Sequence, residues 1–322
     1  MRLGQNPAKS IDKVPQPRRV TVAVLSYLPF LNGYYAEGLE VLKSCLGSLQ
    51  QNTPEPYDLL VFDNGSCEEV REYLQQERQA GKIQFLILAD QNYGKGGAWN
   101  FIFQGAPGEF IAYADSDIRF YPGWLTKTLE ILDAYPQAGM VTARPVRTPE
   151  TFYTNTLAWA RSTPEVTIEQ GTYIPWEIYL EHVLSLGTSE EQAREWYASR
   201  KDTRLTYRGI QALVGAAHFQ FTVRKRQIQL FLPFQMDRPM GQVRSLDDQM
   251  NEADCLRLTT TEPLVKHMGN RISDDEGAIP GQRPARSKRL VDAGPVRRSL
   301  LWAYDRIFKL YFSNPAGSRD EQ

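Results

Sequence analysis

Two aspartates separated by one residue, Asp115 and Asp117, are the first candidates for chemistry in this chain. In an extended or tightly turned segment, residues two apart project to the same side, so both carboxylates could face one ligand. Hard cations such as Mg²⁺ and Mn²⁺ suit oxygen ligands and commonly bridge to substrate phosphates. Most Asp-x-Asp sequences are solvated turns, but this one follows the apolar run Phe110 to Ala114. That position favours a divalent-cation site at the end of a buried strand.

A second acidic residue, Asp63, stands in the sequence Phe62-Asp63-Asn64-Gly65-Ser66. At the carboxyl end of a strand, its carboxylate could accept hydrogen bonds from a nucleobase or a ribose. The same sequence is typical of an Asx-turn or of an N-cap for a helix that begins near Glu68. Both interpretations remain open.

The glycine-rich stretch from Asn92 to Asn100 would allow backbone to approach a ligand closely. It lacks the Walker A pattern, and it follows the third expected strand rather than the first, which excludes the dinucleotide fingerprint. Lys95 within it could touch a diphosphate, but we expect an ordinary surface lysine.

Two features downstream complete the set. Asp247 and Asp248 lie side by side near the start of an expected helix, where one could act as a general base or both could simply favour the helix dipole. His267 follows an apolar strand and could complete a metal shell, or it could be a structural histidine.

The elements around these residues alternate between strand and helix. Apolar runs predict strands at 20–25, 59–62, 83–88, 110–114 and 139–143, and helical spacing predicts helices at 36–51, through Val70 and Leu74, and at 125–134. The strands are apolar on both faces, so we predict an α/β fold with a mostly parallel central sheet flanked by helices. Ligands of such sheets gather at the carboxyl ends of strands, where Asp63 and Asp115 stand.

We expect a flexible leader at 1–17, one half of the protein at 18–145 and a second half at 146–270. Residues 150–208 break the alternation and predict a mainly helical insertion, followed by strand character at 213–223, a helix at 246–258 and a strand ending near Val265. Six large aromatics of this insertion either fill a core or select an acceptor: Trp159, Tyr173, Trp176, Tyr179, Trp196 and Tyr197.

The tail at 271–322 is basic and carries an amphipathic segment at 300–312. Such a helix could lie in a membrane interface through residues 283–312, or it could pack on the protein or in a homodimer. Packing is the interpretation we favour.

Composition bounds the remaining choices. The 322 residues carry a formal net charge of -1, which argues against binding nucleic acid through bulk electrostatics. Three scattered cysteines fit a reducing compartment, and neither a signal peptide nor a membrane span is expected. These features predict a cytoplasmic protein, with peripheral membrane contact only through the tail.

From Val20 to Asn270 the sequence resembles the family 2 glycosyltransferases and their GT-A relatives. The resemblance rests on the opening strand, the Asp-Asn-Gly-Ser turn, the Asn-x-Gly-x-Gly-Gly-x-x-Asn loop, the Asp-Ser-Asp triplet, the late acidic pair and the final histidine. It implies a nucleotide-sugar donor site, a Mn²⁺ or Mg²⁺ ion held by Asp115, Asp117 and His267, and Asp248 as the base. Asp247 replaces the usual Glu, which leaves the choice between the two aspartates open. The implied donor-binding residues are Ser26, Asp63, Asn92, Gly96, Gly97, Asn100 and Asp115.

The resemblance implies transfer of a sugar, from a UDP- or GDP-sugar, to a hydroxyl of a carbohydrate, lipid-linked or other acceptor, with inversion at the anomeric carbon. Retention is the alternative, because retaining enzymes share the fold and the metal motif. A sugar-phosphate nucleotidyltransferase would need a basic, glycine-rich loop where Ser26 to Phe30 stands. A non-catalytic glycan- or nucleotide-binding module would lack metal ligands or a base.

Overall fold

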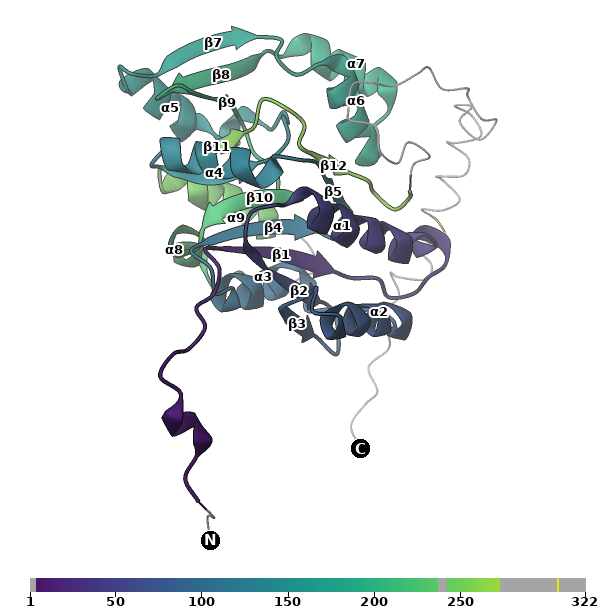
Figure 1. The fold of residues 1–322 in the computed structure, drawn as a ribbon. Helices are drawn as coiled ribbons and strands as arrows, with labels where there is room; N and C mark the ends of the chain where they lie inside the picture. Colours follow the sequence, from purple (N-terminus) through teal and green to yellow (C-terminus); the bar gives the residue numbers. More distant parts are fainter. Residues whose placement is uncertain (1–3, 237–241, 273–305, 307–322) are drawn as a thin grey trace, which may run out of the picture. The chain divides into compact units, whose positions relative to one another are not determined.

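In the part of the chain that the computed structural model describes (residues 4–236, 242–272 and 306), ten strands form one central sheet (Figure 1). Its order is β3-β2-β1-β4-β10-β6-β11-β9-β8-β7. These strands are β1 (Val20–Ser26), β2 (Tyr57–Asp63), β3 (Phe85–Leu88), β4 (Phe110–Asp115), β6 (Ala138–Thr142), β7 (Thr167–Gly171), β8 (Asp202–Tyr207), β9 (Ile210–Val214), β10 (Gln220–Arg224) and β11 (Leu256–Thr259).

The half of the sheet that carries the candidate residues is parallel. β3, β2, β1 and β4 all pair in parallel, with Ser26 opposite Asp63 and Leu25 opposite Asp115. The carboxyl ends of β1, β2 and β4 are therefore level, so the segments that follow them open on the same edge of the sheet. The expected strands in this half are confirmed, although β3 begins two residues later than predicted.

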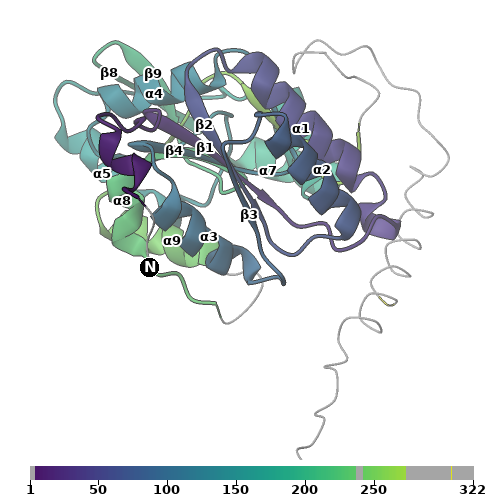
Figure 2. The same ribbon diagram turned by 60° about the horizontal axis from the view of Figure 1, so that its bottom comes forward.

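Helices cover both faces of the sheet, as Figure 2 shows for α1 and α2 on one side and α3 and α9 on the other. Alternate residues of β1 serve the two faces: Val22 and Val24 pack in one apolar core, and Ala23 packs in the other. This alternation follows from the two-residue period of a strand. The first core is closed by α1 (Gly38–Asn52), α2 (Glu68–Gln79) and α4 (Trp124–Ala134), and the second by α3 (Gly94–Gly105), α8 (Lys225–Ile228) and α9 (Gln242–Glu252).

The other half of the sheet is mixed. β10 is antiparallel to both β4 and β6, β11 is parallel to β6, and β9, β8 and β7 continue with antiparallel pairs. A second, two-stranded sheet pairs β5 (Ile118–Phe120) with β12 (Val265–His267). β5 was not predicted, because it is only three residues long. The antiparallel direction of β10 was not predicted either, because the apolar pattern of a strand does not encode its direction.

The insertion at 150–208 contains the expected helices and also two strands. α5 (Thr154–Ser162), α6 (Trp176–Ser185) and α7 (Glu190–Ser199) are helical, whereas β7 and β8 form the edge of the large sheet. The burial pattern of β7 is exposed to intermediate throughout, so it lacks the apolar signal that identifies a buried strand.

The predicted helix at 246–258 is too long. α9 ends at Glu252, Asp254 adopts a positive φ of 54°, and the chain continues as β11. A left-handed residue cannot continue a right-handed helix, so Leu256 and Leu258 belong to the sheet. Short 3₁₀ turns lie at η1 (Pro7–Ser10), η2 (Gly33–Tyr35), η3 (Glu150–Phe152) and η4 (Gln229–Phe231). The amphipathic segment predicted at 300–312 falls outside the described residues, apart from Arg306.

Among the described residues, no helix combines the length and the apolarity that crossing a membrane requires.

Candidate functional site

The Asp-Ser-Asp triplet forms the turn between β4 and β5. β4 ends at Asp115, and β5 begins at Ile118. β12 then pairs with β5, His267 lies opposite Ile118, and the Met268 amide donates to the Asp117 carbonyl at 2.8 Å. This small sheet brings the distant histidine to the triplet.

Asp117 and His267 are in direct contact. The Nε2 atom of His267 lies 3.2 Å from Oδ2 of Asp117. The other carboxylate oxygen, Oδ1, is buried and has no hydrogen-bond partner among the described residues. Burial raises the pKa of Asp117, and the neighbouring His267 partly offsets that shift. A buried carboxylate oxygen without a donor is costly unless another group satisfies it.

The ring of His267 is held from its other side by the insertion. Nδ1 of His267 lies 3.0 Å from Oγ of Ser185, the last residue of α6. The ring of Phe219 packs edge-on against it, with the two ring centroids 5.6 Å apart. These contacts fix both the position and the plane of the imidazole.

Asp115 is paired with Lys95. The Lys95 ammonium lies 2.8 Å from both carboxylate oxygens, and the Tyr113 hydroxyl also donates to Oδ1. Only 13% of the Lys95 side chain is exposed, so the expectation of a surface lysine is wrong. The first turn of α3 points this lysine at the triplet, and the bend at Gly94, with its positive φ of 71°, begins that turn.

A cavity of about 270 Å³ opens beside the triplet. Residues from the end of β1 and the loop after it form one part of its wall, and the segment just after His267 forms another. The lining residues are Leu25, Tyr27, Leu28, Tyr34, Tyr35, Gly38, Val41, Asp115, Ser116, Asp117, Gly269 and Asn270. Acidic and aromatic groups thus share one hollow at the carboxyl edge of the sheet, where ligands of α/β sheets bind.

The chemistry of Asp117 and His267 fits a divalent cation. A carboxylate oxygen without a donor and an imidazole nitrogen beside it are two suitable ligands. The described residues contain no group of three His, Cys, Asp or Glu side chains arranged as a ready metal site. Two protein ligands nevertheless suffice for an ion such as Mg²⁺ when water and substrate phosphates complete its shell.

The acidic pair of α9 divides between interior and solvent. Asp247 is buried and accepts from Arg257 at 2.6 Å, and its Oδ1 lies 2.7 Å from Nε2 of His218. Asp248 has a side chain that is 53% exposed, and its ion pair in the described part of the chain is with Arg244 at 4.0 Å. Contacts lead from Asp247 towards the triplet, because the His218 carbonyl lies 3.5 Å from the Lys95 ammonium.

Asp63 is fully buried and makes a turn contact. Its Oδ2 accepts from the Ser66 amide at 3.1 Å, as the Asx-turn interpretation predicts. It does not cap α2, whose N-cap residue is Cys67. Burial raises the pKa of Asp63, and the bonds from Ser66 oppose that rise. Its Oδ1 has no partner among the described residues.

Two of the remaining candidates for donor binding, Asn92 and Asn100, are held by other parts of the chain, and the buried hydroxyl of Ser26 has no hydrogen-bond partner among the described residues. Asn92 accepts from Gly94 and Asn64, and Asn100 exchanges two hydrogen bonds with the backbone of Phe234. Gly96 and Gly97 are buried within α3, and Ser26 is fully buried. None of these five residues lines the cavity beside the triplet.

Sequence reasoning missed Ser185, His218 and Arg257. Ser185 contacts His267 across 82 residues of chain, His218 contacts Asp247 across 29, and Arg257 contacts Asp247 from the next element of the fold. Arg257 is fully buried, but it fell within the helix predicted at 246–258, whose several other charged residues gave no sign that this one would be buried.

Most aromatics of the insertion pack in cores. Trp159 contacts the rings of Tyr135 and Tyr207, and Trp176 lies against Tyr179 and Tyr197. Trp196, with 43% of its surface exposed, is the exposed one of the six candidates.

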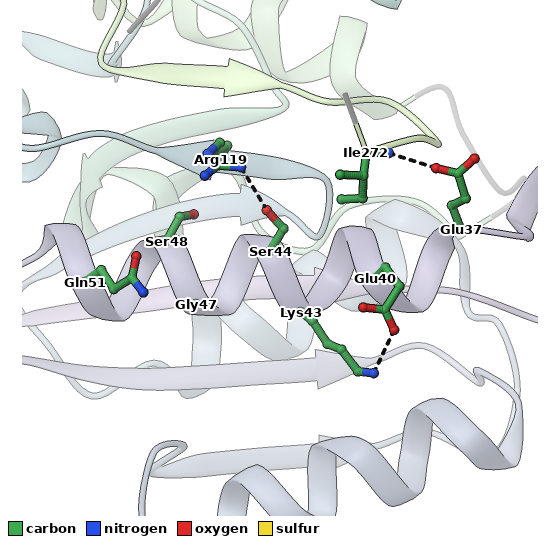
Figure 3. A pocket seen from close by; sticks show the side chains of 9 residues that line it. All are labelled: Glu37, Glu40, Lys43, Ser44, Gly47, Ser48, Gln51, Arg119 and Ile272. Atoms are coloured by element: carbon green, nitrogen blue, oxygen red, sulfur yellow. Dashed lines mark hydrogen bonds and ion pairs between the residues drawn. The ribbon is translucent and has the colours of Figure 1, made fainter. Parts of the chain in front are cut away.

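A larger hollow, of about 590 Å³, lies along the outer side of α1 (Figure 3). Its polar wall includes Glu37, which precedes α1, and the α1 residues Glu40, Lys43 and Ser44. Arg119 of β5 lies opposite. Arg119 donates to Ser44 at 3.4 Å, and Lys43 pairs with Glu40 at 2.7 Å. None of the predicted site residues lines it.

The chain is similar in sequence or in fold to several known proteins. The chain is 25% identical over 100 residues to an uncharacterized glycosyltransferase of Nostoc sp., a match that covers 31% of each protein. Among solved structures, it is similar to TarS of S. aureus (residues 1–349), with 12% identity, a TM-score of 0.45 and coverage of 78% of this chain and 60% of that one. It is also similar to the mannosyltransferase PcManGT of Pyrobaculum calidifontis in complex with GDP-Man and Mn²⁺, with 16% identity, a TM-score of 0.46 and coverage of 78% and 57%.

These matches span less than two thirds of the length of each of those proteins. The family model described as glycosyl transferase family 2 matches residues 29–205, more than half of the chain and both the Asp63 turn and the Asp-Ser-Asp triplet. The protein therefore belongs to glycosyl transferase family 2.

Proposed function

We propose that this protein is a metal-dependent glycosyltransferase that moves a sugar from a nucleoside-diphosphate sugar to a hydroxyl acceptor. Membership of glycosyl transferase family 2 supports the reaction class. The observation that carries the metal site is the Asp117 carboxylate, whose buried Oδ1 has no partner in the described part of the chain while Oδ2 meets His267.

In this proposal Asp117 and His267 hold Mn²⁺ or Mg²⁺ at the wall of the 270 Å³ cavity. When bound, the ion neutralises the charge that develops on the departing diphosphate. Asp115 and Lys95 stand beside it as an ion pair, and a nucleotide's ribose or phosphates would compete with that pair for each partner. The aromatic residues Tyr27 and Tyr35 offer ring faces for a base or a sugar.

For the base that takes the acceptor proton we propose Asp248. Asp247 is already paired with Arg257 and bonded to His218, whereas Asp248 has an exposed carboxylate whose ion pair in the described part of the chain is a long one, 4.0 Å to Arg244. The oxygen of Asp247 that makes both contacts is buried and already occupied, whereas the carboxylate of Asp248 is open to an acceptor hydroxyl. With such a base, the reaction is a single displacement that inverts the anomeric carbon. A product of retained configuration, identified by NMR, would exclude this role for Asp248.

The experiment that tests the function uses the full chain with a panel of UDP- and GDP-sugars. We expect one donor to raise the melting temperature more with Mn²⁺ than without it, and the same donor to be hydrolysed slowly in the absence of an acceptor. A ligand present at one hundred times its Kd stabilises a protein by about 2.7 kcal/mol, which a thermal shift detects.

Asp117→Ala should lose the Mn²⁺-dependent part of both signals. Asp58→Ala is a matched control, because that carboxylate accepts from the Arg18 amide on the surface, far along the chain from the triplet. If no nucleotide sugar binds or is hydrolysed with Mn²⁺ present, the enzyme proposal fails. If turnover persists unchanged in Asp117→Ala, the metal site fails.

A further inference from the structure

The side chain of Ser185 has a single hydroxyl hydrogen, and its contacts say where that hydrogen goes. Oγ of Ser185 lies 2.6 Å from the carbonyl oxygen of His182, one turn earlier in α6. A carbonyl oxygen can only accept, so the hydroxyl donates there. Oγ can then only accept from its second neighbour, Nδ1 of His267 at 3.0 Å.

These two contacts of the Ser185 hydroxyl determine which nitrogen of His267 carries a hydrogen. Nδ1 carries a hydrogen because it must donate to Ser185, so in the neutral ring Nε2 presents a lone pair. That lone pair faces Oδ2 of Asp117 at 3.2 Å. Two acceptors at this distance repel each other unless a proton or a metal cation lies with them.

The helix that supplies Ser185 is anchored firmly to the strand that supplies His267. Glu181 of α6 pairs with Lys266 at 3.2 Å and with Arg144 at 3.0 Å. Arg144 is 1% exposed and also donates to the Val265 carbonyl at 3.0 Å. α6 and β12 therefore keep a fixed distance, and Ser185 keeps its place beside the ring.

We propose that Ser185 is a positioning residue for a metal-binding His267. It holds the imidazole as the Nδ1–H tautomer, directs Nε2 to the cation beside Asp117, and so couples the helix α6 of the insertion to the metal site. The inference rests on the proposed function, because it needs Asp117 and His267 to be the metal ligands. Loss of a hydrogen-bond partner behind a metal-binding histidine typically weakens metal binding by about 10- to 100-fold.

The first experiment measures Mn²⁺ affinity of the full chain by calorimetry or by electron paramagnetic resonance of free Mn²⁺, with the metal alone and with UDP or GDP added. Ser185→Ala should weaken Mn²⁺ binding by about 10-fold or more, and Ser185→Thr should restore it because threonine keeps the hydroxyl. Ser199→Ala is the matched control. The Ser199 hydroxyl makes the same bond to a carbonyl three residues back, at the end of α7, and within the described residues it has no hydrogen bond to a histidine.

The second experiment reads the tautomer directly. Long-range ¹H–¹⁵N spectra distinguish the two neutral forms of imidazole, and His267→Gln assigns the signal among the three histidines of the chain. In the wild type without metal we expect a hydrogen on Nδ1 of His267, either in the Nδ1–H tautomer or in the imidazolium that also carries a proton towards Asp117. In Ser185→Ala we expect a mixed or Nε2–H signal. A purely structural role for Ser185 would not change this signal in a folded variant.

The outcomes separate the inference from the function. If Asp117→Ala and His267→Ala bind Mn²⁺ as the wild type does, the metal site itself is wrong. If both lose Mn²⁺ while Ser185→Ala binds it as Ser199→Ala does, or if His267 is already the Nε2–H tautomer, only the role of Ser185 is overturned.

Discussion

Lys95 reaches both carboxylate oxygens of Asp115 at 2.8 Å, so the first aspartate of the triplet is neutralised by the chain's own cation. The two aspartates therefore differ: within the described ranges Oδ1 of Asp117 is buried without a hydrogen-bond partner, whereas both carboxylate oxygens of Asp115 contact Lys95. The ammonium also lies 5.4 Å from the ring of Trp99 and 5.5 Å from that of Tyr113, which adds a cation–π contribution of about 0.5–2 kcal/mol.

Replacing Lys95 should change metal and nucleotide binding in opposite directions. In Lys95→Met, Asp115 is released and the site is more negative, so we expect Mn²⁺ alone to bind several-fold tighter. UDP or GDP should bind more weakly, because a cation near the diphosphate is lost. Calorimetric titrations with each ligand check both signs. Lys43→Met on the outer side of α1 is the control, and identical effects of the two substitutions would contradict a role for Lys95.

The two aspartates of α9 should behave differently when each becomes asparagine. Asp247→Asn leaves the buried Arg257 without its countercharge, so unfolding should need about 3–5 kcal/mol less free energy. Asp248→Asn removes an exposed carboxylate and should leave stability within about 0.5 kcal/mol, while turnover falls strongly and donor binding persists. Urea denaturation and a transfer assay measure the two properties. Full turnover in Asp248→Asn would exclude it as the base.

His182 should make the protein sensitive to acid. Burial, with Arg144 and His267 nearby, lowers its pKa to about 3 from the ordinary value of 6.5. Between these values the unfolded chain binds a proton that the folded protein does not, so stability falls as the pH drops below 6.5. From pH 6.5 to 5.0 this loss amounts to at most about 2 kcal/mol.

His182→Gln should flatten that pH dependence. The raised pKa values of Asp63 and Asp117 act in the opposite direction, but they are common to both proteins and cancel in the comparison. Denaturation of wild type and variant at pH 7.5 and pH 5.0 gives the difference. An equal loss of stability in the two proteins would refute the shift.

Gly65 should tolerate no side chain. It has a positive φ of 85°, and a Cβ there would lie 2.7 Å from the backbone carbonyl carbon of Gln91. Gly65→Ala therefore combines backbone strain of about 1–2 kcal/mol with a clash against backbone that cannot rotate away. Gly81→Ala is the control, since Gly81 has a similar φ of 75° and open space around it. Thermal denaturation should show a clearly larger loss for Gly65→Ala than for Gly81→Ala.

Much of this protein could be predicted from local sequence. Runs such as Val20 to Leu25 and Phe110 to Ala114 identify buried strands, because a strand covered on both faces must be apolar throughout. The level ends of parallel strands then bring Asp63 and Asp115 to one edge before any coordinates are known. Local patterns also show that the glycine-rich segment is neither a Walker A loop nor a dinucleotide fingerprint. They place the Asp-Ser-Asp triplet after a buried strand, and they carry the family resemblance.

Tertiary structure decided which of the candidate side chains meet. The pairing of β12 with β5 sets His267 beside Asp117, and the rotation of α9 turns Asp247 inward and Asp248 outward. Burial of Lys95 against Asp115 and the contact of Ser185 with His267 likewise join residues 20 and 82 positions apart. Such contacts depend on packing between elements, and residue type and spacing within one element carry no information about a partner in another.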